Sequence, residues 1–339
     1  FSRDLSDNAK MMEVKHIQGR ERSLPIAILT GMRPAHWIKN GFVLAPLLYS
    51  MKFAEPLAWR LSLLATAAFC LLSSAIYLWN DVHDAASDSQ NPQKAHRPIA
   101  SGHLSKFAAL VSAAVLLCLG MAMLWKCQSI AEQSPGPSAH YLLLWGAGYV
   151  VLNVFYTLVC KHVNLLDVIC IALGFVLRAM AGAAALNVQI SPWLVVCTFT
   201  ICIYIAITKR RAELISLGLS ASDTREVHKD YTLETLGRLQ SVALSMSLMM
   251  YSIYCLAPAT IKRFGSPNLI WTIPLVVFAM FRFDHTSHVM ERGDVVRVLL
   301  GDKVLWLAGI LFVALTVLMI KFGAHPSMQF LEVPSVEAT

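Results

Sequence analysis

Long apolar runs constrain this 339-residue chain more than any other feature of its sequence. A stretch of about 20 apolar residues is long enough to cross a bilayer core of about 30 Å as a helix. Inside a bilayer each backbone group must find its hydrogen bond within the protein, so each such run is predicted to be helical. Nine runs can be placed, at residues 25–50, 57–80, 105–126, 139–160, 164–186, 192–208, 238–258, 267–282 and 303–322.

The domain organisation follows from these runs. Only 14% of the residues are charged, against roughly 25% in a soluble domain, and no stretch between the runs is long enough to fold alone. We therefore expect an all-α polytopic membrane protein with nine transmembrane helices in one bundle. It would consist of a cytoplasmic N-terminal segment at 1–24, a transmembrane domain at 25–322 and a C-terminal tail at 323–339. Because residue 1 is Phe and not Met, the sequence leaves open whether a further piece of chain or a tag lies upstream.

The basic residues indicate how the chain is oriented. A formal net charge of +7 raises nucleic acid as a partner. The Lys and Arg residues lie between apolar runs, however, and form no stripe with interleaved aromatic residues, so we expect no nucleic-acid partner. Most of the 28 Lys and Arg fall in loops that share one side with the N-terminus. The positive-inside rule therefore predicts that the N-terminus, residues 80–102 and the loop at 209–237 face the cytoplasm.

A polar block at residues 80–102 interrupts the apolar pattern. At about 100° of rotation per residue, Asn80, Asp84 and Asp88 share one face of a helix, and Asp81 lies nearly in line with Asp88. Like charges so close repel each other unless a cation lies among them, so the pattern predicts a divalent metal site. Oxygen ligands favour Mg²⁺, which completes its shell with water and substrate phosphates. A solvated helix end with capping residues is the simpler alternative.

Basic and polar residues elsewhere suit an anionic ligand. Lys94 and Arg97 follow the acidic residues within one short loop. Ionisable groups inside membrane helices cost about 2.5–3.5 kcal/mol each on insertion scales, so those that occur are functional candidates. The ionisable candidates within the runs are Lys39, Asp167 and Arg178, and the polar Asn40 lies beside Lys39. For Asp167, a structural ion pair with another helix is the alternative.

The ends of the fourth and sixth runs add a second polar group of residues. It comprises Tyr156, Lys161, Lys209, Arg210 and Glu213. Basic residues at a cytoplasmic helix end are often only membrane anchors. Together with the acidic block on the same side of the membrane, however, they favour a substrate that carries a metal-bound diphosphate and a further phosphate, which Lys and Arg bind.

The acidic motif resembles a known family. Asn80-Asp81-x-x-Asp84-x-x-x-Asp88 on the second of nine membrane helices is similar to the first aspartate-rich motif of the UbiA-type intramembrane prenyltransferase superfamily, and the resemblance extends from about residue 30 to 322. It implies a helical bundle around a central cavity that opens laterally to lipid. It also implies that Mg²⁺ bridges a diphosphate to Asn80, Asp81, Asp84 and Asp88, the three aspartates being catalytic.

Within that superfamily the chain resembles the branch that transfers phosphoribose to polyprenyl phosphates. The resemblance rests on four stretches: Arg33-Pro-x-x-Trp37-x-Lys39-Asn40, Lys94-x-x-Arg97-Pro-Ile-Ala-Ser-Gly102, Asp167 through Arg178-Ala-Met-Ala-Gly182, and Lys209-Arg210-x-x-Glu213-Leu214. It implies phosphoribosyl pyrophosphate as donor and a decaprenyl-type phosphate as acceptor. It also implies a place in the bacterial cytoplasmic membrane and in cell wall biosynthesis. One departure is Asn91 before Pro92, where the branch has His-Pro.

The second polar region separates this branch from its relatives. Aromatic prenyltransferases of the superfamily carry a second D-x-x-x-D motif there, whereas this chain reads Lys-Arg-Arg-Ala-Glu, with Asp223 and Asp230 farther on. A basic region suits a phosphate better than a second metal. The alternatives are an aromatic prenyltransferase with the same fold and first motif, and a transporter or lipid-binding membrane protein. Homo-oligomerisation stays open.

Overall fold

The computed structural model describes residues 23–91, 94–217, 232–289, 298 and 301–325. Within these ranges the regular secondary structure is helical and contains no strand, which confirms the all-α prediction. The tail at 323–339, the N-terminal segment at 1–24 and the loop at 209–237 lie wholly or partly outside the described residues, as do Asp223 and Asp230.

The first apolar run does not form one helix, so the prediction of a continuous helix at 25–50 is wrong. It is divided into α2 (Leu24–Met32), the 3₁₀ helix η1 (Pro34–Val43) and α3 (Ala45–Tyr49). Arg33, between α2 and η1, adopts a left-handed conformation with φ 54°. Proline disfavours a helical conformation in the residue before it and has no N–H to continue the helix, so Pro34 ends α2 here.

The other eight runs form helices that are long and apolar enough to cross a membrane. Among the described residues these spans are Pro56–Gln90, Lys106–Ala131, Ala139–His162, Leu166–Ala185, Pro192–Ile215, Leu233–Leu256, Asn268–Ser287 and Lys303–Phe322. The count of nine is therefore not confirmed. The second run continues to Gln90, ten residues past its predicted end, so the acidic residues of the polar block are helical.

The chain divides into two compact units, which share two helices. The first contains residues 1–34 and 73–116, and the second residues 35–72 and 117–339. Both α4 (Pro56–Gln90) and α5 (Lys106–Ala131) contribute to each unit. In the first unit α2 packs on α4: Ser74 Oγ donates to the Met32 carbonyl at 3.2 Å, and Gly31 lies against the side chain of Leu78.

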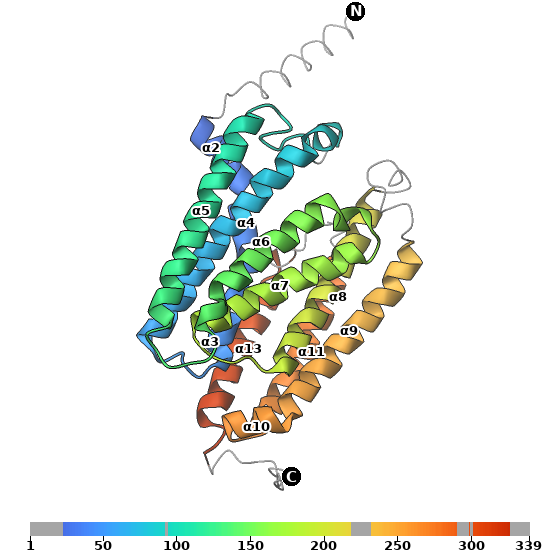
Figure 1. The fold of residues 1–339 in the computed structure, drawn as a ribbon. Helices are drawn as coiled ribbons and strands as arrows, with labels where there is room; N and C mark the ends of the chain where they lie inside the picture. Colours follow the sequence, from blue (N-terminus) through green and yellow to red (C-terminus); the bar gives the residue numbers. More distant parts are fainter. Residues whose placement is uncertain (1–22, 92–93, 218–231, 290–297, 299–300, 326–339) are drawn as a thin grey trace, which may run out of the picture. The chain divides into compact units, whose positions relative to one another are not determined.

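The second unit is built around α7 (Leu166–Ala185), most of which is buried. Figure 1 shows α6 (Leu142–Leu158), α7, α8 (Pro192–Leu217) and α9 (Leu233–Leu256) as successive neighbours. The unit also contains α10 (Pro258–Phe264), η6 (Asn268–Thr272), α11 (Ile273–Val289) and α13 (Lys303–Phe322). Short turns η2 (Ala139–Tyr141) and η3 (Cys160–His162) flank α6. Because α6, α7 and α8 are consecutive and antiparallel, the C-terminal ends of α6 and α8 meet the N-terminal end of α7.

Candidate functional site

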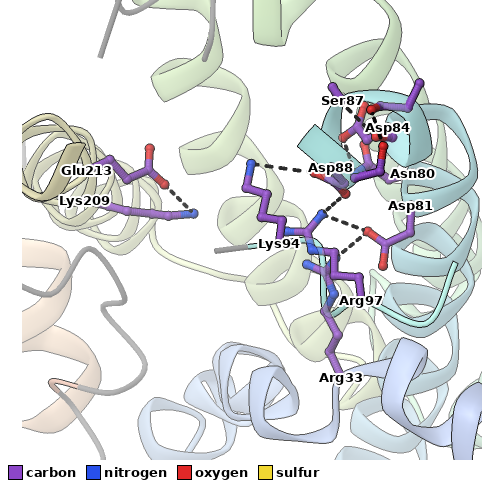
Figure 2. A network of polar contacts seen from close by, with 12 residues as sticks. Arg33, Asn80, Asp81, Asp84, Ser87, Asp88, Lys94, Arg97, Lys209 and Glu213 are labelled. Carbon is purple, nitrogen blue, oxygen red and sulfur yellow. Dashed lines mark hydrogen bonds and ion pairs between the residues drawn. The ribbon is translucent and has the colours of Figure 1, made fainter. Parts of the chain in front are cut away.

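In the first unit, two buried carboxylates are surrounded by three cations (Figure 2). Asp81 and Asp88 are only 2% and 3% exposed. Arg97 Nη1 donates to Asp81 Oδ1 at 3.1 Å and also to Asp88 Oδ2. Arg33 Nη2 donates to Asp81 Oδ1, and Lys94 Nζ lies 3.9 Å from Asp88 Oδ1. Of the predicted site residues, the structure therefore brings Asp81, Asp88, Lys94 and Arg97 together.

The local sequence explains this arrangement. Asp81 and Asp88 are seven residues apart on α4, so they share its buried face. After the helix ends, backbone bonds from Lys94 N to the Asn91 carbonyl (2.9 Å) and from Arg97 N to the Lys94 carbonyl (2.9 Å) turn the chain back toward the helix. The carboxylates are thus fixed on a helix, while the cations come from the segments outside it.

The other two predicted metal ligands form a separate pair. Asn80 Nδ2 donates to Asp84 Oδ2 at 2.9 Å, and both side chains are half-buried. The oxygen donors suit Mg²⁺ in chemistry. Their arrangement does not: among the described residues no three His, Cys, Asp or Glu side chains are placed to hold a metal ion. Arg97 Nη1 lies between Asp81 and Asp88, and the metal role of the four residues stays a prediction.

In the second unit, a buried arginine joins the ends of three helices. Arg210 of α8 donates from Nε to Asp167 Oδ2 at 2.6 Å, from Nη1 to Glu213 Oε2 at 2.6 Å, and from Nη2 to the Tyr156 hydroxyl at 3.2 Å. Lys209 Nζ lies 3.5 Å from Glu213 Oε1, a pair also drawn in Figure 2. Two carboxylates thus balance two cations. The structure shows the interhelical pairing of Asp167 that the sequence left as the alternative.

A second buried arginine of this unit has only neutral partners. Arg178 donates from Nε to Asn40 Oδ1 at 2.8 Å, from Nη1 to the Gly174 carbonyl at 2.9 Å, and from Nη2 to the Tyr149 hydroxyl at 2.8 Å. Its guanidinium carbon lies 4.4 Å from the centre of the Tyr149 ring. Asn40 also donates to Cys70 Sγ at 3.3 Å. Among the described residues no carboxylate forms an ion pair with Arg178, so its charge is stabilised by dipoles and aromatic faces.

The last two predicted cations are half-buried and lie on short 3₁₀ segments. Lys39 is on η1, where its Nζ lies 3.4 Å from His36 Nδ1. Lys161 is on η3, between α6 and α7. Elsewhere in the second unit, a cavity of about 210 Å³ is lined by residues of α3, α8, α9, α10 and the α7–α8 connection, and none of the predicted site residues lines it.

Two residues that the sequence did not assign to a site take part in these networks. From the sequence, Arg33 is equally consistent with an anchor at the membrane interface. In the structure it lies between α2 and Pro34, and its side chain contacts Asp81. Tyr149 lies in an apolar run and gives no signal of its own. The contact of Tyr149 with Arg178 depends on which residue of α7 faces the tyrosine, and a single sequence does not show that.

Comparison with known proteins agrees with the helical fold. The model of the UbiA prenyltransferase family matches residues 43–293, and the chain belongs to this family of integral membrane proteins. The decaprenyl-phosphate phosphoribosyltransferase of Corynebacterium glutamicum is 27% identical over 292 residues, which cover 84% of this chain and 83% of that protein. That of Mycobacterium tuberculosis is 25% identical over 309 residues, 89% of this chain and 96% of that protein.

A solved structure shares the fold. The UbiA homolog from Archaeoglobus fulgidus, determined bound to DMAPP and Mg²⁺, superposes with a TM-score of 0.62 at 16% identity and covers 86% of this chain and 98% of its own. At that identity the likeness establishes the fold and nothing finer.

Proposed function

We propose that the protein transfers the 5-phosphoribosyl group from phosphoribosyl pyrophosphate to a polyprenyl phosphate of the decaprenyl type and releases diphosphate. The observation that carries the proposal is the convergence of Arg33, Lys94 and Arg97 on the aspartate motif. Three cations around two carboxylates suit a strongly anionic donor. The names of relatives that match most of the chain, and the basic second region, support the phosphoribosyl branch of the family.

The reaction needs little beyond positioning and positive charge. An oxygen of the lipid phosphate would attack C1 of the ribose, and the bond from C1 to the diphosphate oxygen would break, with its electron pair leaving on diphosphate. The lipid phosphate is already an anion, so no general base is required. Arg33, Lys94 and Arg97 would bind the diphosphate and stabilise the charge that develops on it, Arg by paired hydrogen bonds.

Basic residues outside the aspartate motif are candidates for the remaining phosphates. We assign Lys39, Lys161 and Lys209 to phosphate binding, because all three are half-buried cations: Lys39 and Lys161 lie on 3₁₀ segments, and Lys209 lies in the C-terminal half of α8. Arg210 is assigned a positioning role: its contacts with Asp167, Glu213 and Tyr156 fix the ends of α6, α7 and α8. The positive-inside pattern supports placing the reaction at the cytoplasmic face. Mg²⁺ is proposed as cofactor on the chemistry of the aspartate motif.

A labelled-substrate assay tests the function. Purified protein in nanodiscs is incubated with ¹⁴C-labelled phosphoribosyl pyrophosphate and decaprenyl phosphate, and in parallel with a labelled prenyl diphosphate and 4-hydroxybenzoate. We expect label in the lipid fraction of the first reaction only. K94Q should lower that rate at least about tenfold, because it removes a charged contact to the diphosphate. The control K106Q alters an exposed lysine at the start of α5 and should leave the rate unchanged.

Two outcomes contradict the proposal. Label in a prenylated aromatic acid and none in the polyprenyl phosphate would identify an aromatic prenyltransferase. No transfer in either reaction, together with lipid binding that D84N leaves intact, would identify a lipid-binding or transport protein.

A further inference from the structure

A cavity of the second unit is lined by buried hydroxyl groups. This cavity, of about 210 Å³, is bordered by α3, the α7–α8 connection, the start of α8, the end of α9 and α10, and we call it the α10 cavity. Ser191 and Thr260 line it, and among the described residues neither Ser191 Oγ nor Thr260 Oγ1 has a hydrogen-bond partner. Thr260 is only 3% exposed, and the buried Tyr254 adds a third hydroxyl-bearing side chain to the wall. Because a buried hydroxyl without a partner is costly, these groups suit a ligand that accepts hydrogen bonds.

Arg263 of α10 adds positive charge to the α10 cavity. Its Nη1 donates to the Gln189 carbonyl at 3.3 Å, and its other N–H groups are donors of the same kind. In the described part of the chain no carboxylate pairs with Arg263, and the residues that line the cavity include no acidic side chain. Guanidinium and hydroxyl groups donate hydrogen bonds to phosphate oxygens, whereas a carboxylate in the lining would repel an anion. The lining therefore suits a phosphate group better than a cation.

The α10 cavity lies at a helix end that carries the marks of a membrane interface. Pro192, which lines it, is the first residue of α8, and Arg210 lies 18 residues farther along this helix, about 27 Å away at 1.5 Å per residue. The cavity and the Arg210 network are therefore at opposite ends of α8. Trp193, next to Pro192, and Trp271 on η6 are 40% and 50% exposed. Tryptophan is enriched at the level of lipid head groups, so the cavity opens where phosphate groups of lipids occur.

We propose that the α10 cavity is a phosphate-binding site, formed by none of the residues of the proposed active site, and that its ligand is the head group of a phospholipid or free phosphate. Its volume is below the roughly 300–1,000 Å³ of pockets for drug-sized ligands, so it suits a head group and not a whole lipid. Val188, Ile190 and Leu194 add apolar surface to the lining. A head group brings carbon atoms to this surface and free phosphate does not, so the lining favours the head group. The inference does not depend on the proposed function.

The test measures lipid binding to the purified, delipidated full chain by native mass spectrometry. The two probes are dioleoylphosphatidylglycerol and dioleoylglycerol, which have the same acyl chains but differ in the phosphate. We expect wild-type protein to bind the phospholipid at least about tenfold more tightly, because the diacylglycerol offers no charged acceptor. Free phosphate is tested separately, by equilibrium dialysis of the same protein against ³²P-labelled inorganic phosphate.

The variants compare two neighbouring cations of α10. R263Q removes the cation that lines the cavity and should weaken phospholipid binding about tenfold. K262Q is the matched control: it removes an equal charge from the next residue, which is exposed and does not line the cavity, and it should bind as wild type does. T260V and Y254F each remove one hydroxyl with little change of shape, and each should weaken binding by about threefold to tenfold.

The results distinguish the two sources of phosphate and the case of no site. Phospholipid binding that R263Q weakens and K262Q does not identifies a head-group site, and the same pattern with ³²P-labelled phosphate identifies a site for the free anion. Equal weakening by R263Q and K262Q would show only attraction to a basic surface and would overturn the proposal. Equal binding of the two lipids, with no binding of labelled phosphate, would also overturn it, because the hydroxyls would then bind water alone. If R263Q does not fold, as judged by its thermal unfolding, T260V and Y254F decide.

Discussion

Among single residues, Arg178 carries a buried charge that the described residues do not neutralise. It is 6% exposed in the middle of α7, and its three hydrogen-bond acceptors are an amide, a carbonyl and a phenol. Hydrogen bonds to a charged group contribute about 1.5–3 kcal/mol each, more than bonds between neutral groups. The contacts of Arg178 with Asn40 and Tyr149 therefore stabilise η1, α6 and α7 against one another.

Tyr149→Phe removes one of these acceptors without changing the shape of the core. We expect it to lower the free energy of unfolding by about 1.5–3 kcal/mol, because a buried charged donor is left without its partner. Denaturant titration in detergent micelles measures the change. The control is Tyr141→Phe on η2, an exposed tyrosine whose replacement should have little effect. Equal stability of the two variants would show that Arg178 does not depend on the phenol.

At the scale of helices, α7 and η1 approach so closely that their contact admits only glycine. A Cβ on Gly182 would lie 2.1 Å from the backbone oxygen of Val43. The obstacle is backbone and not the flexible end of a side chain, so either α7 or η1 must move to relieve the clash. The junction of η1 and α3 at Val43 is thus packed against a glycine of a helix far away in the sequence.

Gly182→Ala should therefore destabilise the protein, by about 1–3 kcal/mol as in other overpacked cores. The matched control is Gly309→Ala on α13, where an added Cβ meets nothing within 4 Å. That substitution should stabilise by up to about 1 kcal/mol, since alanine loses less entropy in a helix. Thermal unfolding of both variants checks the opposite signs, and a stabilised Gly182→Ala would refute the close contact.

The start of α13 depends on a charged N-cap. Asp302 is 5% exposed and accepts from Arg282 Nε at 2.8 Å, from the Thr286 hydroxyl at 2.9 Å and from the backbone N–H groups of Val304 and Leu305. The hydrogen bonds from Arg282, with those from Thr286 and the backbone, lower the pKa of Asp302 to about 2. Its charged form is therefore favoured in the folded protein.

The lowered pKa of Asp302 determines the direction in which the stability of the folded protein changes with pH. The folded pKa lies below the usual value of about 4, so the stabilisation is complete above pH 4 and is lost as the pH falls toward 2. Asp302→Asn should reduce this acid-dependent loss and cost about 1–2 kcal/mol at neutral pH, the range found for weakened caps. Unfolding measured at pH 6 and pH 3 gives both quantities. An unchanged slope between these pH values in the variant would assign the acid sensitivity to other groups.

For the whole molecule, the sequence predicts those features that depend on the hydrophobicity and length of its apolar runs. The eight long spans were predictable because each must supply about 20 apolar residues. The break at Arg33 and Pro34 was not, because it depends on backbone conformation within an equally apolar run. Asp81, Asp88, Lys94 and Arg97 were predictable as a group, since all lie within 17 residues of one another. The partners of Arg178 and Arg210 come from 29 to 138 residues away, apart from two within their own helices, and only packing defines them.

The orientation of the whole chain is the last prediction. α5 has 26 residues, so at 1.5 Å per residue it is about 39 Å long and its two ends must lie on opposite sides of a core of about 30 Å. The positive-inside pattern predicts that the end near Ser101 faces the cytoplasm and the end near Gln133 faces outside. Both residues are exposed. In a Cys118→Ser background, a membrane-impermeant maleimide should label Gln133→Cys in right-side-out vesicles and Ser101→Cys only in inverted ones. The reverse labelling pattern would place the acidic motif outside the cell. Phosphoribosyl pyrophosphate is a cytoplasmic metabolite and could not reach it there. That result would contradict both the predicted topology and the proposed function.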